Sequence, residues 1–220
     1  MNHMNNHCTE LVLILDRSGS MAGFEADTVG GFNATIEKQR ETEGVVYVST
    51  VLFDNEIEVL HDRVEIGRIP PMTRRDYRVG GCTALLDAIG GAIHHIGTIH
   101  KYARPEDVPA HTVFIITTDG MENASHRYDS ATVKAMIERQ RREFGWEFLF
   151  LAANIDAVET AERIGIRRER AANYRPDPTG YQVTYKAMSD AIETVRRGGD
   201  LDDADWRRAL DKDHKGRGRT

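Results

Sequence analysis

Short apolar runs alternate along the chain with segments in which apolar residues recur every three or four positions. Nearly continuous apolar runs are typical of strands that a sheet buries on both faces, and the three-to-four spacing is typical of amphipathic helices. Their alternation predicts a mainly parallel sheet with right-handed helical crossovers. The runs with strand character are Leu11 to Leu15, Val45 to Phe53, Thr112 to Thr117, Phe148 to Ala152 and a weaker Arg170 to Tyr174.

The segments between these runs predict the helices and one hairpin. The turn Asp54-Asn55 follows a strand so closely that the next strand, around Glu56 to Leu60, must be antiparallel to it. We therefore expect an α/β fold: a doubly wound, mainly parallel sheet of about six strands, with one antiparallel edge strand and helices on both faces. Helical faces are expected at Val29 to Ile36, Leu85 to Ile96, Val133 to Gln140 and from Pro178 to Val195, with a short helix from Asp156 to Ile164 capped at Asp156.

Composition limits the class of protein. The 220 residues are 40% hydrophobic and 29% charged, which is typical of one ordinary globular domain. No apolar run approaches the roughly 18 residues of a membrane span, and the N-terminus lacks the apolar core of a secretory signal, so we expect a cytoplasmic protein. The net charge of −6 disfavours nucleic acid and anionic membranes as partners. The two cysteines, Cys8 and Cys82, are too few for a disulfide framework and are expected to be too far apart to bridge.

The domain organisation follows from the same patterns. Residues 1–9 are polar and are predicted to form a flexible N-terminus, and residues 10–197 are predicted to form the folded domain. From Gly198 onward, 12 of 23 residues are charged, and the large apolar residues are Leu201, Trp206 and Leu210. This composition predicts that residues 198–220 form a disordered tail or a loosely docked helix.

Polar side chains follow the predicted strands at the edge where parallel sheets bind ligands. Asp16, Ser18 and Ser20 stand at alternate positions after the first strand, and Asp119 follows the run that ends in Thr117. Thr83, after two glycines, is expected to cap the helix that begins there and to bring a third hydroxyl to the same crevice. Two carboxylates and three hydroxyls form an all-oxygen ligand set that suits Mg²⁺, with Mn²⁺ as a second possibility. Waters would complete the coordination and leave a position for an outside oxygen ligand.

These segments resemble the von Willebrand factor A domain, which is also the I domain of integrins. Its metal-ion-dependent adhesion site (MIDAS) consists of an Asp-x-Ser-x-Ser loop, a distant Thr and a distant Asp. The matching positions here are Asp16, Ser18, Ser20, Thr83 and Asp119, and the resemblance extends over roughly residues 9–197.

The resemblance implies a stand-alone, Rossmann-like binding module without enzymatic activity. In the family, the five residues hold the metal directly or through water, and a partner protein completes the site with an Asp or Glu carboxylate. Neutral hydroxyl ligands leave more positive charge on the ion for that carboxylate. The resemblance also suggests a chaperone-type ATPase as a partner.

Two other functions are open at this point. A Mg²⁺-dependent phosphatase of the haloacid dehalogenase type also begins with an Asp after its first strand, but it needs a second Asp where this chain has Ser18. A scaffold with a vestigial metal site is the other alternative. Around the five residues, Glu122, Asn123, Asn154 and Asp156 are expected either to shape partner choice or to be ordinary loop residues, and Asp87 is expected to be a polar helix position or a hydrogen-bond acceptor near the site.

Overall fold

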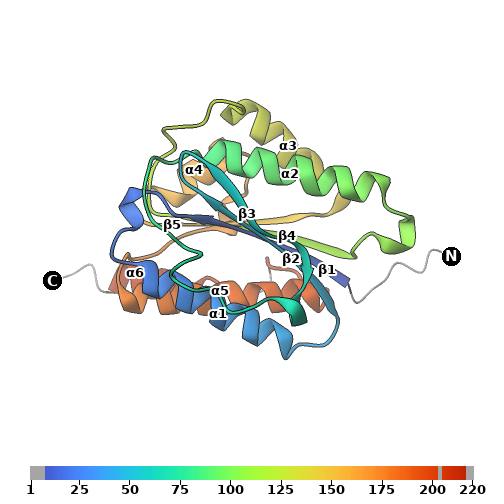
Figure 1. Ribbon diagram of the computed structural model, residues 1–220, viewed down its shortest axis with the longest axis horizontal. Helices are drawn as coiled ribbons and strands as arrows, with labels where there is room; N and C mark the ends of the chain where they lie inside the picture. The colour runs from blue at the N-terminus through green and yellow to red at the C-terminus, as the bar shows by residue number, and fades with distance from the viewer. Residues whose placement is uncertain (1–7, 203–204, 217–220) are drawn as a thin grey trace.

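Six strands form one sheet in the computed structural model, which describes residues 8–202 and 205–216 (Figure 1). The strand order is β3-β2-β1-β4-β5-β6; β3 is antiparallel to β2, and every other neighbouring pair is parallel. The structure confirms the predicted α/β class and the antiparallel edge strand. The strands are β1 (Cys8–Asp16), β2 (Val45–Phe53), β3 (Ile57–Glu65), β4 (His111–Thr118), β5 (Glu147–Ala152) and β6 (Ala171–Asn173).

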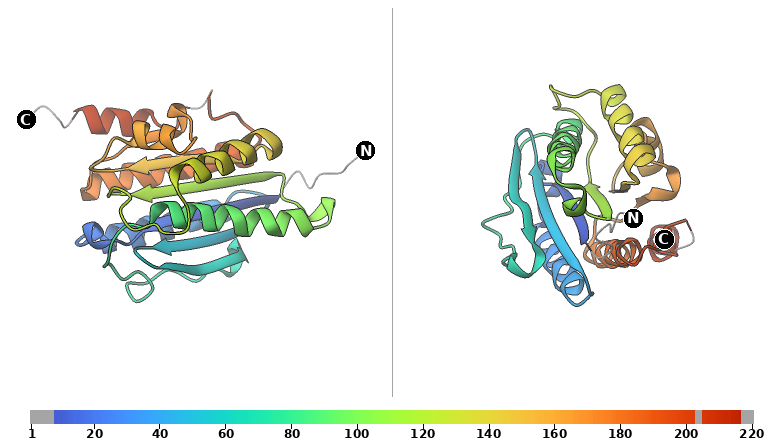
Figure 2. Two further views of the ribbon diagram at one scale, coloured as in Figure 1. Left: turned by 90° about the horizontal axis from the view of Figure 1, so that it is seen from above. Right: turned by 90° about the vertical axis from the view of Figure 1, so that its right-hand side faces the viewer.

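Helices cover both faces of the sheet (Figures 1 and 2). None of the helices in the described part of the chain has the length and apolar character that crossing a membrane requires. One face carries α1 (Glu25–Arg40), α5 (Pro178–Arg196) and α6 (Arg208–Gly216), and the other carries α2 (Leu85–Tyr102), α3 (Ser130–Phe144) and α4 (Ala157–Arg163). Short 3-10 turns lie at η1 (Gly19–Met21), η2 (Ile66–Arg68), η3 (Pro105–Asp107) and η4 (Arg168–Arg170).

The central strand β1 shows why the apolar runs lack polar alternation. All nine of its residues are buried, because β2 and β4 flank it and helices cover both faces. Leu11, Leu13 and Leu15 belong to the core under α1 and α5, whereas Val12 and Ile14 belong to the core under α2 and α3. Both faces of the strand are therefore apolar, and the sheet separates two cores.

Aspartates begin three of the helices. Asp129, Asp156 and Asp177 are the N-caps of α3, α4 and α5, and each accepts a hydrogen bond from the backbone N–H three residues later. A carboxylate at this position satisfies a free amide of the first turn and lies favourably in the helix dipole. The predicted cap at Asp156 is confirmed.

Strand β1 begins before the predicted domain boundary at residue 10. Cys8 and Thr9 already belong to β1, where they pair with the start of β2, and the prediction for residues 1–7 lies outside the described residues. Cys8 and Cys82 are both free, as expected.

The described part of the tail packs against the domain. Leu201, Trp206 and Leu210 have exposed fractions of only 3%, 5% and 1%, and they join the core beneath α5. In the described residues the structure thus has the second of the two expected arrangements, a docked helix, at α6. These three apolar residues stabilise the tail despite its high charge, because burial of large apolar side chains offsets the cost of ordering the chain.

Buried Arg170 explains why the start of the tail docks where it does. This side chain is 2% exposed, and its guanidinium pairs with Glu147 at 2.8 Å and with Asp200 at 3.4 Å, as well as with Asp202. Two of the three carboxylates come from the tail. The tail thus supplies the negative charge that a guanidinium buried behind β6 requires.

Candidate metal centre

Three loops meet where β1 and β4 end, at the left-hand edge of the sheet in Figure 1. The first carries Asp16, Ser18 and Ser20, the second precedes α2 and carries Thr83, and the third begins at Asp119. β1 and β4 are neighbours in the sheet, so the first and third loops leave it side by side.

Asp16 is fixed at both carboxylate oxygens. Oδ1 accepts the backbone N–H of Ser18 at 2.7 Å, and Oδ2 accepts the Thr118 hydroxyl at 2.5 Å. The Tyr77 hydroxyl donates to the Asp16 carbonyl oxygen, and the Asp16 residue is 1% exposed. Sequence reasoning missed Thr118 and Tyr77, because a hydroxyl that orients another side chain leaves no spacing pattern in the sequence.

The other predicted residues converge on the same point. Ser18 Oγ lies 3.1 Å from Ser20 Oγ, and Ser20 Oγ donates to Asp119 Oδ1 at 2.5 Å. Ser20 Oγ and Thr83 Oγ1 each lie 3.3 Å from the position that a Cβ atom on Gly120 would take. The second Asp119 oxygen, Oδ2, is buried without a hydrogen-bond partner.

Glycines allow the first two loops to approach closely. Gly19 N–H donates to the Gly81 carbonyl at 3.0 Å, and Gly80 N–H donates to the Arg17 carbonyl at 2.9 Å. Gly81 has a φ of +72°, and a Cβ there would lie 2.0 Å from Asn55 Oδ1. A larger residue at position 81 would therefore be strained and would separate the Thr83 loop from the Asp16 loop.

Thr83 does not cap α2, contrary to expectation. The N-cap of α2 is Ala84, which has no side-chain hydrogen bond, and two amides of the first turn are satisfied from the Asp119 loop, by Glu122 and Ser125. Glu122 and Asn123 were expected to shape partner choice or to be ordinary loop residues, yet both bond inward to the α2 segment.

The remaining expected residues lie in structural roles or at the surface. Asp156 caps α4, and Asn154 is exposed with a φ of 57°. Asp87 is the hydrogen-bond acceptor that its position suggested: its carboxylate binds the backbone N–H groups of residues 126–128, in the loop that Asp119 begins.

Burial dominates the electrostatics of the two carboxylates. Burial raises the pKa of Asp16 above its ordinary value; hydrogen bonds from Thr118 and Ser18 lower it, and the nearby charge of Asp119 raises it further. Burial also raises the pKa of Asp119, against a lowering by the Ser20 hydroxyl. Both carboxylates therefore lie in surroundings that favour neutralisation of their charge.

Arg17 does not supply that neutralisation. It stands between Asp16 and Ser18 in sequence, but its guanidinium pairs with Asp54 at 2.9 Å and with Glu58. Its positive charge is thus balanced by the β2–β3 hairpin, which leaves the Asp16 and Asp119 carboxylates without a cationic side chain in hydrogen-bond contact among the described residues.

The donor set fits a hard divalent cation. In the described ranges, no three His, Cys, Asp or Glu side chains are grouped so that they could hold a metal ion by themselves. A cation here would depend on hydroxyl and water ligands beside the two carboxylates, which is the oxygen chemistry that Mg²⁺ and Mn²⁺ prefer. Asp119 Oδ2, buried and unpartnered, is the atom that such a cation would satisfy.

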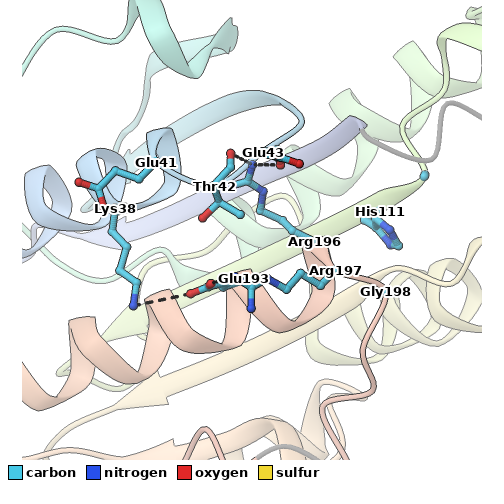
Figure 3. Close-up of a pocket in the computed structure, with 10 residues that line it drawn as sticks. Lys38, Glu41, Thr42, Glu43, His111, Glu193, Arg196, Arg197 and Gly198 are labelled. Carbon is cyan, nitrogen blue, oxygen red and sulfur yellow. Dashed lines mark hydrogen bonds and ion pairs between the residues drawn. The ribbon is translucent and has the colours of Figure 1, made fainter.

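A separate cavity of about 830 Å³ lies between the C-terminal ends of α1 and α5 (Figure 3). Arg196 donates to the carbonyl oxygens of Gln39 at 2.7 Å, Thr42 at 2.9 Å and Glu43 at 3.0 Å, so its guanidinium caps α1. None of the five predicted metal-site residues lines this cavity. Its residues join α1 to α5 and contribute nothing to the three loops.

The fold is that of a von Willebrand factor A domain. No family model matches the chain, and no curated protein sequence does. Solved structures do match: the von Willebrand factor type A protein from Catenulispora acidiphila has a TM-score of 0.53 and 14% identity, over 82% of this chain and 41% of that one. At this identity the likeness shows the fold alone.

Two further structures share the fold. Proximal thread matrix protein 1 from the mussel byssus, solved with a zinc-occupied MIDAS motif, has a TM-score of 0.57 and 16% identity, over 86% of this chain and 46% of that one. VWA2, the ArnB paralog from Sulfolobus acidocaldarius, has a TM-score of 0.50 and 19% identity, over 82% of this chain and 45% of its own. This chain thus spans less than half the length of each of the three proteins.

Proposed function

We propose that the protein is a metal-dependent protein-binding module that holds Mg²⁺ through Asp16, Ser18, Ser20, Thr83 and Asp119. A carboxylate of a partner's Asp or Glu would complete the ligand set. The observation that carries the proposal is the buried, unpartnered Asp119 Oδ2 among converging hydroxyls, because a buried carboxylate oxygen without a donor is costly unless a cation satisfies it.

The ligand chemistry explains why such a site would bind a partner. Two carboxylates balance the charge of a divalent ion only if both bind it directly, and the other three ligands are neutral hydroxyls. An ion held in this way keeps water molecules that an anionic oxygen from outside can replace. Ser20 is exposed, so the site is reachable from solvent. The zinc-occupied MIDAS motif of the mussel protein supports a divalent cation at this position of the fold.

The local contacts favour binding over catalysis. A serine nucleophile needs a general base in hydrogen-bond reach, and among the described residues the hydroxyls of Ser18 and Ser20 contact each other and Asp119, with no histidine beside them. The phosphatase alternative lacks its second aspartate, because position 18 is a serine whose side chain bonds to Ser20. A cytoplasmic location and a chaperone-type ATPase partner are proposals that rest on the sequence pattern and on family resemblance.

Titration calorimetry with Mg²⁺ and Mn²⁺ tests the metal site. Chelator-treated wild type is expected to bind one ion, and Asp119→Asn is expected to abolish binding. Asp156→Asn is the matched control, because it removes a carboxylate from the N-cap of α4, outside the three loops. A wild type that binds neither ion would favour the vestigial scaffold instead.

A second titration tests the position for the partner's carboxylate. Bound Mn²⁺ enhances water-proton relaxation through its exchangeable waters, so a ligand that displaces water lowers the enhancement. We expect the acetylated, amidated peptide Gly-Glu-Gly to lower it and the matched peptide Gly-Gln-Gly to leave it unchanged. Equal effects of the two peptides would refute carboxylate capture.

A further inference from the structure

Glu122 takes over the capping role that the sequence assigned to Thr83. One carboxylate oxygen, Oε2, accepts the backbone N–H of Leu86 and the Ser125 hydroxyl, both at 2.8 Å. The other, Oε1, accepts the N–H groups of Ala124 at 3.0 Å and Ser125 at 2.7 Å. Glu122 thereby satisfies a free amide in the first turn of α2 from a segment 36 residues away in the chain.

Asn123 holds the backbone of Thr83 on both sides. Its side-chain Oδ1 accepts the Thr83 N–H at 2.8 Å, and its own backbone N–H donates to the Thr83 carbonyl at 3.1 Å. A single residue thus satisfies both backbone polar groups of Thr83. Because Asn123 and Glu122 belong to the loop that begins at Asp119, the position of Thr83 is tied to the position of that carboxylate.

These contacts leave the Thr83 side chain free for another role. A threonine that caps a helix directs its hydroxyl toward the amides of the first turn. Here Glu122 and Ser125 accept the amides of the first turn, and Thr83 Oγ1 instead faces Gly120, 3.3 Å from the site of a Cβ on that glycine. Thr83 is 4% exposed, so its hydroxyl is held inside the site.

We propose that Glu122 and Asn123 are positioning residues of the metal site, which hold the Thr83 hydroxyl in place relative to Asp119. The inference rests on the proposed metal binding. Residues that orient ligands of a metal commonly change its affinity about 10–100-fold when substituted. A residue that only caps a helix changes stability and leaves metal affinity unchanged.

Mn²⁺ titration of the full chain separates these two roles. We expect Glu122→Gln and Asn123→Ala each to raise the Mn²⁺ dissociation constant roughly 10–100-fold. Asn123→Asp keeps the oxygen that accepts the Thr83 N–H, so it is expected to bind Mn²⁺ no more weakly than wild type. Asp156→Asn changes a comparable carboxylate cap, on α4 and outside the three loops, and is expected to leave the dissociation constant unchanged. Thermal unfolding of each variant shows how much stability the substitution removes.

A double-mutant cycle tests whether Glu122 acts through Thr83. Thr83→Val removes the hydroxyl, so adding Glu122→Gln to it is expected to weaken Mn²⁺ binding no further. Full additivity of the two effects would overturn the inference, as would wild-type affinity in Glu122→Gln and Asn123→Ala. A wild type that binds no Mn²⁺ would overturn the proposed function and this inference with it, whereas wild-type binding with unaffected variants would overturn the inference alone.

Discussion

Two adjacent glycines in α1 provide a test of how closely α1 and α5 pack. A Cβ added at Gly31 would lie 1.9 Å from Cδ2 of the Tyr185 ring, whereas a Cβ at Gly30 would meet no atom within 4 Å. Tyr185 is 6% exposed and belongs to the core, so its ring has no space into which to move. Gly30→Ala and Gly31→Ala therefore make the same chemical change in the same helix with opposite expected outcomes.

The magnitudes follow from two opposing effects. Alanine is favoured over glycine inside a helix by about 0.5–1 kcal/mol, and this is the whole effect expected at Gly30. At Gly31 the same gain is outweighed by overpacking, which typically costs about 1–3 kcal/mol and more where the neighbour is rigid. The two variants should thus differ by roughly 1–3 kcal/mol, or by roughly 2–12 °C in melting temperature for a chain of this length.

Urea and thermal unfolding, followed by circular dichroism, measure this difference. Gly30→Ala is expected to be more stable than wild type and Gly31→Ala less stable. The pair Gly91 and Gly90 in α2 repeats the design, because a Cβ at Gly90 would lie 2.5 Å from the Tyr128 ring and a Cβ at Gly91 would be free. A Gly31→Ala variant at least as stable as Gly30→Ala would refute the close contact between α1 and α5.

Three further predictions concern buried charge and the docked tail. Burial alone would raise the pKa of Asp87, but three backbone N–H donors lower it below its ordinary value, so Asp87→Asn should lower the free energy of unfolding in urea by roughly 1–3 kcal/mol at pH 7. The difference between the two proteins should shrink as the pH falls below the ordinary carboxyl range and through the depressed pKa; a difference that stays constant down to the acid limit of the folded state would contradict the reasoning. Trp206→Ala should lower the free energy of unfolding in urea by about 3–5 kcal/mol, because it removes a large buried side chain. A loss below about 1 kcal/mol would mean that the tail is not docked. Arg63→Ala should lower the free energy of unfolding by roughly 3 kcal/mol in the same measurement, since among the described residues it leaves the side chain of the fully buried Glu10 with only His100 as a partner. Glu10→Gln in the same chain should recover part of that loss.

The sheet and the outline of the candidate site were predictable because they depend on local patterns. Runs such as Leu11 to Leu15 are apolar on both faces, which only a strand between two helical layers requires. Asp16, Ser18 and Ser20 follow such a strand directly, so their place at the edge of the sheet follows from the strand prediction. The antiparallel hairpin follows from the short turn at Asp54 in the same way.

The parts that could not be predicted depend on partners distant in sequence. Thr83 has the composition of a cap, but the cap comes from Glu122, and nothing near either residue indicates that pairing. Likewise, the tail's charge suggested disorder, because the counter-charge that orders it, Arg170, belongs to a different segment. The composition of one segment carries no information about contacts with another segment that is distant in sequence, and these contacts form only when the fold brings the two together.

The docked tail also determines how the sheet can associate with other chains. An uncovered edge strand offers unpaired backbone groups to a strand of another molecule. β6 has only three residues, and α6 packs against it, while nine-residue β3 at the opposite edge carries exposed charge at Glu58, Asp62 and Glu65. Charged side chains thus protect the β3 edge of the sheet, and helix α6 covers the β6 edge. A chain cut before α6 would expose the β6 edge and would be expected to self-associate through it.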